Sequence, residues 1–414
     1  MSDGNNQEAF NKISEDLRFL MNLFKKMLEG IGKDDLAKEL PWVSKGLPGK
    51  HEFKADLIQA YSMAFQFLNM VEENAANQIR RKLETERGVS SWRGLWGSHL
   101  KKLLAEGVSQ EEIAMALAKT RVEPVLTAHP TEARRITALD QHRELYLSLV
   151  QKENPMWTPF ELSELRDNIQ SMMERLWRTG EVYLTKPTVA SERASQEHYL
   201  EKIFPEVIKK IDRRLEDACR ENGLDEKCFS DPFALPKIRF GTWVGGDRDG
   251  HPFVTPEVTE DSLLEFRLRA ILLQKKTLES LRACLSLSDT LQDPPKLLLN
   301  ALVNQWAIIG SKAKMITKRN PNEPWRQYLS ALIERLPLAS TEEGVSAALS
   351  SNIYYTYRHA RELIHDLNIL RNSLLEIGAD HVVKVDVNPV IRQCETFGFH
   401  LAKLDIRQNS GFYD

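Results

Sequence analysis

Apolar residues recur at steps of three and four along most of the chain, which is the spacing of one face of an α-helix. The first such run lies between Phe10 and Ile31, and a second extends from about Phe53 to Leu83. The same spacing predicts further helices over roughly residues 191–222, 257–288, 297–318, 324–337 and 353–376. The pattern therefore predicts a mainly α-helical protein.

Two helix starts carry a more specific signal than the spacing alone. Ser109 is followed three residues later by Glu112. Thr158 is likewise followed by Pro159 and Glu161. In such a capping box the hydroxyl accepts a hydrogen bond from a first-turn N–H, and the carboxylate accepts one from the N–H of the cap residue. We therefore expect one helix to begin directly after Ser109 and another directly after Thr158.

Strand-like runs are short and far apart, at residues 122–127, 237–244 and 400–406. Each is a compact apolar or β-branched run bounded by a turn or a charged segment, as is typical of buried parallel strands separated by helices. Strands this few cannot close a sheet among themselves. We therefore expect either a small parallel sheet or the first strands of a barrel whose other strands are not in this sequence.

The composition excludes several classes of protein. The 414 residues include 56 Lys and Arg against 59 Asp and Glu, so the net charge of −3 gives no indication of a nucleic-acid partner. The four cysteines are scattered without a CxxC pair, which disfavours a zinc site and favours a reducing cytoplasm. No apolar run approaches the roughly 20 residues of a membrane helix, and the first residues do not resemble a signal peptide. We therefore expect a cytoplasmic protein without membrane contact.

The segment Val125–Arg135 is the first candidate for chemistry, because an apolar run ends there at His129. Pro130 restricts the histidine to an extended backbone. The histidine can be an ordinary polar residue at a strand end, since surface histidines are common. It can also be a general acid or base, because imidazole titrates near neutral pH.

The residues after His129 predict a helix that starts at once. Thr131 can cap a helix beginning at Glu132, which would place Arg134 and Arg135 on the first turn. Positive charge there is unfavourable against the helix dipole. The two arginines are therefore expected to neutralise either a bound anion or neighbouring carboxylates.

The second candidate segment, Phe240–Pro252, carries glycines, two aspartates and an arginine directly after a strand. Its glycines permit positive φ and let a loop bend closely past a ligand. Asp247 and Asp249 either form a local ion pair with Arg248 that stiffens the loop or orient it toward a phosphate. The segment lacks the Gly-Lys-Ser/Thr ending of a P-loop and the final Glu of a calcium loop.

The third candidate segment is Leu404–Gln408, which ends a strand run with Arg407. Arg407 and Asp405 lie on the same face of a strand, so one alternative is a buried ion pair between them. The other is a guanidinium presented at the carboxyl end of the strand, where barrel enzymes place their active sites.

These three segments, in this order, resemble the phosphoenolpyruvate carboxylase family. The matching residues are Thr127–Thr131, Gly245–Gly250 with Pro252, Val254–Val258, and Leu404–Gln408 with Ser410. The resemblance implies a mainly α-helical fold with a few parallel strands, the N-terminal part of a helix-rich (β/α)8 TIM-like barrel. It further implies an N-terminal helical region over residues 1–120. Residues 121–414 would then be the first part of the barrel, with long helical insertions.

The resemblance also implies a reaction. Enzymes of this family are lyases that join bicarbonate to phosphoenolpyruvate, giving oxaloacetate and phosphate through carboxyphosphate and the enolate of pyruvate. They are anaplerotic, carbon-dioxide-fixing enzymes of the cytoplasm that use Mg²⁺ or Mn²⁺ and form homotetramers at full length. Phosphoenolpyruvate and bicarbonate are therefore the expected partners of a complete enzyme.

By position, the resemblance assigns roles to individual residues. His129 matches the family's histidine that takes the carboxyl proton, and Arg407 matches an arginine that binds the substrate's phosphate. Arg134 and Arg135 correspond to a basic pair that binds an anion or a sugar-phosphate activator. Asp247, Arg248 and Asp249 match the family's loop near the site without individual roles.

Two departures from the family pattern limit these expectations. The family's basic pair begins six positions after the histidine, whereas Arg134 and Arg135 stand at five and six. The glycine-rich loop and the metal-binding carboxylates of the family's second half are absent from this sequence. We therefore expect the N-terminal portion of a longer enzyme, inactive by itself, with its metal ligands elsewhere. The alternative is a non-catalytic half-barrel homologue that acts as a scaffold or assembly partner.

Overall fold

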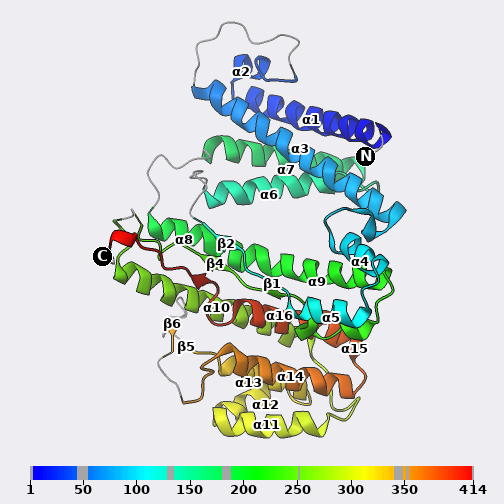
Figure 1. The fold of residues 1–414 in the computed structure, drawn as a ribbon. Helices are drawn as coiled ribbons and strands as arrows, with labels where there is room; N and C mark the ends of the chain where they lie inside the picture. Colours follow the sequence, from blue (N-terminus) through cyan, green and yellow to red (C-terminus); the bar gives the residue numbers. More distant parts are fainter. Residues whose placement is uncertain are drawn as a thin grey trace. The chain divides into compact units, whose positions relative to one another are not determined.

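The chain folds into two compact units in a computed structural model, which describes residues 3–43, 55–127, 135–179, 188–249, 252–339, 348–350 and 354–412 (Figure 1). The first unit combines residues 1–91 with 131–187, and the second combines residues 92–130 with 188–414. Each unit is therefore built from two separate stretches of the chain. The boundary expected at residue 120, between an N-terminal helical region and the first part of a barrel, stays a prediction.

The first unit is helical throughout its described residues. Its elements are α1 (Asp3–Gly30), α2 (Asp34–Lys38), α3 (Ala55–Arg87), η1 (Val89–Ser91), α6 (Ile136–Gln151) and α7 (Pro159–Thr179). The apolar faces of these helices share one core, in which Phe24 of α1 meets Phe67 of α3 edge to face with ring centroids 5.4 Å apart. Residues at helical spacing in distant segments therefore do bury one another, as the pattern predicted.

The second unit combines a few short strands with many helices. They are α4 (Trp96–Ala105), α5 (Gln110–Lys119), α8 (Val189–His198), η2 (Tyr199–Ile203), α9 (Phe204–Glu221), η3 (Glu226–Cys228), η4 (Pro232–Ala234), α10 (Pro256–Cys284), α11 (Lys296–Ile309), α12 (Lys312–Arg319), α13 (Pro324–Glu334), α14 (Ala360–Glu376), α15 (Asp380–Val382), η5 (Val383–Val387), α16 (Asn388–Phe397) and η6 (Ser410–Phe412). The mainly helical prediction is confirmed.

Both predicted capping boxes are confirmed. The Ser109 hydroxyl accepts from the Glu112 N–H at 3.2 Å, and the Glu112 carboxylate accepts from the Ser109 N–H at 3.0 Å. Thr158 and Glu161 make the same pair of bonds at 3.3 and 2.7 Å before α7. These local signals fixed both helix starts to the residue.

Three helix predictions need correction. The helix expected over 191–222 is interrupted by the π-helical turn η2, which ends two residues before Pro205. Proline lacks an N–H, so the regular i→i−4 bonding cannot continue through it. The helix expected over 297–318 is broken at Gly310, where φ is +60°. The helix expected over 353–376 begins only at Ala360, and the sequence pattern assigned no element to the helical stretch 380–397.

The strands are parallel, as predicted, and shorter than the apolar runs. β2 (Val125–Leu126), β4 (Gly241–Thr242) and β7 (Lys403–Leu404) form one sheet in the order β2-β4-β7. Ahead of it, β1 (Arg121–Val122) pairs in parallel with β3 (Lys237–Ile238). A further antiparallel pair, β5 (Leu338–Ala339) with β6 (Ala348–Leu349), was not predicted. The parallel strands do not close on themselves, so the barrel stays a prediction.

A stack of aromatic rings holds the parallel strands against the helices around them. Phe240, just before β4, stacks on Phe204 of α9 with centroids 4.5 Å apart and on Phe397 of α16 at 5.5 Å. All three belong to one apolar cluster that also includes residues of α10. The carboxyl ends of β2, β4 and β7 are thereby fixed beside one another, which determines where the loops after them begin.

Candidate functional site

The loop after β4 begins with a tight turn that only glycine accommodates. The N–H groups of Gly246 and Asp247 both donate to the carbonyl of Trp243, at 2.9 and 3.0 Å. Gly245 stands at the third position of this turn with φ +88°, as a type II turn requires. A Cβ on Gly245 would lie 2.8 Å from the Cβ of Ser262 and closer still to its hydroxyl oxygen. The predicted role of the glycines in bending the loop is therefore met at Gly245.

The loop pairs with the segment that follows β7. The Arg407 N–H donates to the Gly246 carbonyl at 3.0 Å, and the Arg248 N–H donates to the Arg407 carbonyl at 2.9 Å. Asp247 and Arg407 thus form a parallel bridge beyond the ends of the strands. A Cβ on Gly246 would lie 2.9 Å from Leu404 Cγ and closer still to the Asp405 carbonyl oxygen. Two of the three predicted segments therefore meet at the carboxyl end of the sheet.

The Arg407 side chain is held from two sides and remains open to solvent. Its guanidinium carbon lies 4.3 Å from the centroid of the Trp243 ring, and one Nη lies 3.4 Å from a carboxylate oxygen of Asp247. The side chain is 43% exposed. The alternative of a buried Arg407 paired with Asp405 is therefore wrong. The structure supports the other alternative, a guanidinium presented at the carboxyl end of a strand.

The remaining loop side chains are directed toward neighbouring elements. Arg248 donates from Nη2 to the hydroxyl of Thr259 on α10 at 3.2 Å. Asp247 pairs with Arg407, and its other oxygen accepts from the Asp249 N–H at 3.2 Å. These contacts take the place of the ion pair expected between Arg248 and its two neighbours. The loop is stiffened through β7 and α10 instead.

The structure describes only part of the segment Val125–Arg135. His129 and Arg134 lie outside the described residues, as does the helix start expected at Glu132. Arg135 is described and precedes α6 with φ −71° and ψ 136°, an extended conformation. The prediction that Arg135 lies on the first helical turn is therefore wrong: Arg135 is the residue directly before that turn, at the N-terminus of α6. Arg135 belongs to the first unit, whereas the loop and Arg407 belong to the second.

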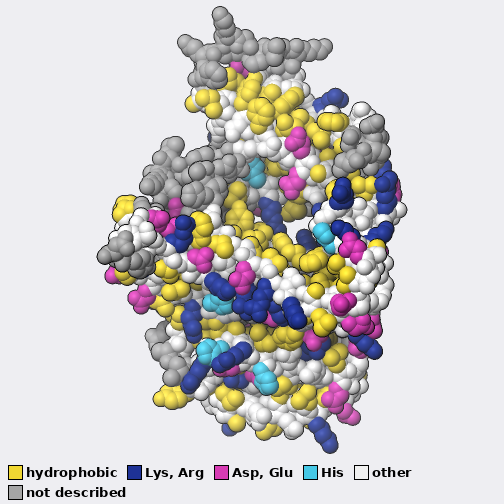
Figure 2. All heavy atoms as spheres, viewed as in Figure 1, with side chains coloured by type: hydrophobic (Ala, Val, Ile, Leu, Met, Phe, Trp, Pro, Cys, Tyr) yellow, Lys and Arg dark blue, Asp and Glu magenta, His cyan; other side chains and the backbone are white. Residues whose placement is uncertain are grey.

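A basic cluster lies at the opposite, amino end of the strands. Arg121, Arg239 and Lys403 surround Glu123, and basic side chains also gather in the middle of the view in Figure 2. The hydrogen bond from Lys403 and the nearby positive charges lower the pKa of the Glu123 carboxyl, against an opposing effect of desolvation. Because the cluster precedes β2 and β4, it is separated from the Gly245 loop by the length of the strands.

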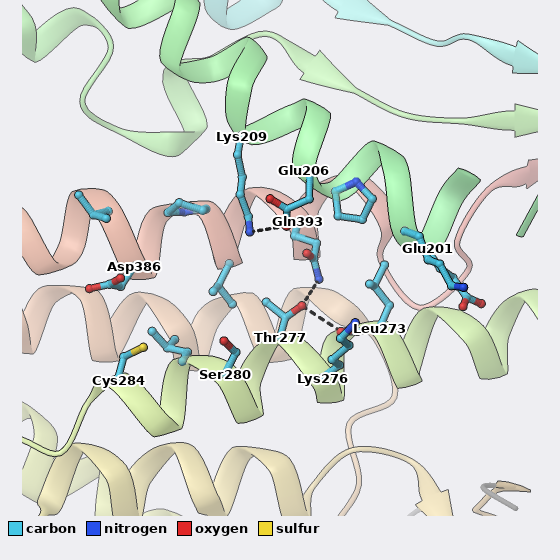
Figure 3. Close-up of a pocket in the computed structure, with 16 residues that line it drawn as sticks. Glu201, Glu206, Lys209, Leu273, Lys276, Thr277, Ser280, Cys284, Asp386 and Gln393 are labelled. Atoms are coloured by element: carbon cyan, nitrogen blue, oxygen red, sulfur yellow. Dashed lines mark hydrogen bonds and ion pairs between the residues drawn. The ribbon is translucent and has the colours of Figure 1, made fainter. Parts of the chain in front are cut away.

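A cavity of about 490 Å³ lies between α9, α10 and the helical stretch η5–α16 (Figure 3). Thr277 and Gln393 meet across it in a 2.6 Å hydrogen bond, and Glu206 pairs with Lys209 on one wall. Its charged lining residues are Lys202, Lys209, Lys276, Glu201, Glu206 and Asp386. Equal numbers of each sign give no preference for the charge of a ligand, and no residue of the predicted segments lines it.

Two further classes of function were tested on the described residues. Within the described ranges, no group of three or more His, Cys, Asp or Glu residues is placed to hold a metal ion. Among the helices that the structure describes, none is both long and apolar enough to cross a membrane.

The comparison with known proteins decides what this arrangement of segments belongs to. A family model described as phosphoenolpyruvate carboxylase matches residues 7–414. The chain belongs to the phosphoenolpyruvate carboxylase family. The match covers both compact units and all three segments that carry the resemblance.

Curated members of the phosphoenolpyruvate carboxylase family are similar over most of this chain. The enzyme of Methylorubrum extorquens is 32% identical over 359 residues, covering 87% of this chain and 38% of the relative. The enzyme of Xanthomonas euvesicatoria is 33% identical, covering 90% of this chain and 40% of the relative. The enzyme of Roseiflexus castenholzii is 29% identical, covering 98% and 45%. The chain thus spans about two fifths of the length of the carboxylases it matches.

The sequence pattern missed one residue of this carboxylase-family site. Trp243 was not among the candidate residues, yet it is half-buried and its ring supports the Arg407 guanidinium. Its place directly after a strand and before the glycine turn was the available signal. No such signal pointed to its partner Arg407, 164 positions later in the chain, because nothing in the local sequence indicates which strands become neighbours.

Proposed function

We propose that this chain supplies the phosphate-binding part of a phosphoenolpyruvate carboxylase active site. The observation that carries the proposal is Arg407, held over Trp243 and beside Asp247 with its side chain 43% exposed at the carboxyl end of the parallel strands. A planar guanidinium fork binds phosphate through two parallel N–H donors, which suits the phosphoryl group of phosphoenolpyruvate. Strand ends of this kind carry the active sites of barrel enzymes.

The neighbours of Arg407 suit a binding role in two ways. The Trp243 ring restricts the guanidinium plane without neutralising its charge. The contact with Asp247, at 3.4 Å, is long and partly exposed, so it is a weak ion pair that a phosphate can displace. Both features leave the positive charge available to a ligand while limiting the number of conformations it samples.

The proposed chemistry at His129 is proton transfer. In the reaction that we assign to the complete enzyme, bicarbonate attacks the phosphate of phosphoenolpyruvate, giving carboxyphosphate and the enolate of pyruvate. His129 then takes the carboxyl proton of carboxyphosphate, the bond from its carboxyl carbon to the phosphate oxygen breaks to release carbon dioxide and inorganic phosphate, and the enolate carbon attacks the carbon dioxide to give oxaloacetate. An imidazole of near-neutral pKa is suited to such a step.

Mg²⁺ or Mn²⁺ is part of the proposal for the complete enzyme. The residues described in this structure offer no group of three carboxylate, imidazole or thiolate side chains for it. We therefore propose that the ligands of the metal lie outside the described residues. For the same complete enzyme we propose a (β/α)8 barrel, a homotetramer and a cytoplasmic location.

The proposal is tested by titrating the purified chain with phosphoenolpyruvate in a calorimeter. Arg407→Lys keeps the charge but loses the fork and the stacking, so binding is expected to weaken about tenfold or more. Arg319→Lys, at an exposed position in the last turn of α12, is the matched control and should leave binding unchanged. Equal affinities of wild type and Arg407→Lys would contradict the proposal.

A second measurement tests the assignment of the chemistry. We expect the 414-residue chain alone to produce no oxaloacetate from phosphoenolpyruvate, bicarbonate and Mg²⁺ in a coupled assay. Rapid bicarbonate-dependent turnover by the pure chain would show that the metal ligands are among its own residues. In an active complete enzyme, His129→Asn should sharply reduce oxaloacetate formation and spare part of the phosphate release. Unchanged oxaloacetate formation would exclude His129 as the base.

A further inference from the structure

The turn at Gly245 rests on two hydroxyl groups of α10. The Thr259 hydroxyl lies 2.7 Å from the Gly245 carbonyl oxygen, and the Ser262 hydroxyl packs against the Gly245 Cα, where a Cβ would collide. Thr259 is 8% exposed and Ser262 is fully buried. The two residues are three apart on the helix and therefore face the turn together. This close packing fixes the distance between α10 and the loop.

Thr259 contacts both ends of the loop. Its hydroxyl accepts from Nη2 of Arg248 at 3.2 Å. The hydroxyl has a single proton, and the Gly245 carbonyl at 2.7 Å is a closer acceptor than the Thr255 carbonyl at 3.2 Å. One buried side chain thus ties the peptide of the glycine turn to the guanidinium three residues later.

The loop passes this constraint to Arg407 through its backbone. Gly246 accepts from the Arg407 N–H and Arg248 donates to the Arg407 carbonyl. These two bonds flank the residue whose side chain lies over Trp243. Any shift of the turn away from α10 therefore moves both backbone partners of Arg407 and the ring beneath its guanidinium.

We propose that Thr259 is a positioning residue that holds the Gly245–Arg248 loop so that Arg407 keeps its place over Trp243 and beside Asp247. The inference rests on the proposed function for the ligand that Arg407 would bind. Ser262 contributes a second attachment, since its hydroxyl accepts from Nη1 of Arg193 on α8 at 3.1 Å and donates to the Val258 carbonyl at 2.7 Å. Of these two hydroxyls, that of Thr259 is the one that bonds both the turn and Arg248.

The test compares Thr259→Val, which keeps the shape and removes the hydroxyl, with Thr259→Ser, which keeps the hydroxyl. Hydrogen–deuterium exchange of the Arg248 and Arg407 amides is measured in the 414-residue chain. Thr259→Val should lower their protection about tenfold, since it removes one bond to a carbonyl and one to a charged group. Thr259→Ser should stay within about twofold of wild type. Thr317→Val on α12 removes a comparable intrahelical hydroxyl bond of 3.0 Å and should not change either amide.

Binding provides the readout that a merely structural role would leave unchanged. The dissociation constant for phosphoenolpyruvate should rise about fivefold to tenfold in Thr259→Val and recover in Thr259→Ser. Unchanged exchange and unchanged binding in folded Thr259→Val would overturn the inference. If wild type itself binds no phosphoenolpyruvate, the proposed function fails while the exchange data still decide the role of Thr259.

Arg248→Met keeps the inference testable if Thr259→Val does not fold. This variant removes the guanidinium that donates to Thr259 and retains an apolar stem. It should lower the protection of the Arg407 amide in the same direction. In the double variant the two losses should be less than additive, because both remove the same contact. Fully additive losses would show that Thr259 and Arg248 act independently and would overturn the inference.

Discussion

Replacing Gly246 by alanine tests the pairing of the loop with β7 more directly than any other single change. Gly246 does not have a positive φ, so an alanine at this position introduces a clash without backbone strain. Its Cβ would lie 2.9 Å from Leu404 Cγ and closer to the Asp405 carbonyl oxygen. Backbone atoms cannot rotate away as a side chain can. The loop and the segment at the end of β7 must therefore separate by several tenths of an ångström or more.

The magnitude follows from two contributions. Overpacking at a rigid contact costs about 1–3 kcal/mol. Separation also weakens the hydrogen bonds at 3.0 and 2.9 Å between the loop and Arg407, each worth about 0.5–1.5 kcal/mol. We expect Gly246→Ala to lower the local stability of the pairing by about 2–6 kcal/mol. Because the chain forms two units, a single unfolding free energy is not defined for it. The appropriate assay is amide exchange of peptides from β4 and β7, with peptides of α1 and α3 as the internal reference.

Two other glycines separate the sources of the effect. A Cβ on Gly30 meets nothing within 4 Å, so Gly30→Ala should be neutral or slightly stabilising. Gly107 has equally open space but φ +85°, so Gly107→Ala reports backbone strain without a clash. Exchange in β4 and β7 of Gly246→Ala that matches the Gly30→Ala protein would refute the close approach between loop and strand.

Three further changes examine the electrostatics and the core. Trp243→Leu removes the ring beneath Arg407, a contact worth about 0.5–2 kcal/mol, and should weaken phosphoenolpyruvate binding in calorimetry; unchanged binding would exclude a role for the ring. Burial raises the pKa of the Glu197 carboxyl, so the folded state retains its proton to higher pH than the unfolded state, and stability falls as pH rises through that window. Glu197→Gln should therefore gain local stability relative to wild type as pH rises above about 4.3, the ordinary pKa of Glu, in amide exchange of α8 peptides compared at equal pH, and parallel curves would contradict this. Tyr357→Phe removes a buried 2.6 Å hydrogen bond to Asp366 and should speed amide exchange in α14, at a cost of about 1–3 kcal/mol. Exchange unchanged in α14 would show that the carboxylate finds another donor.

Local signals predicted the helical part of the fold well, and they failed where the backbone departs from regular geometry. Ser109 and Thr158 fixed helix starts because the capping bonds involve residues within one turn. The pattern missed the interruption before Pro205, since apolar spacing continues through a π-helical turn with a small change of phase. It missed residues 380–397 because Val-Val-Lys-Val-Asp-Val alternates like a strand, although Val383 and Val387 are buried at helical spacing.

The candidate site shows a different limit. Arg407 was identified as a candidate, and the structure chose between its two alternatives by bringing Trp243 and Asp247 to it. The choice depends on β4 lying between β2 and β7, a non-local pairing that neither segment encodes on its own. Residue type and strand end can therefore nominate a functional arginine. Only the neighbours supplied by distant strands show whether its charge is neutralised by an ion pair within the protein or remains available to a ligand.

The same reasoning explains why the loop attaches to α10 and not to its own flanking charges. A loop stiffened only by an ion pair between Arg248 and an adjacent aspartate would keep its shape but could still rotate as a body about the end of β4. Bonds to Thr259 on one side and to Arg407 on the other fix its orientation as well. A phosphate-binding guanidinium needs that second restraint, because its two donors must meet two oxygens in one plane. On the proposed function, the hydroxyl on α10 and the glycines that allow it to approach would therefore contribute to phosphate binding through the position of Arg407.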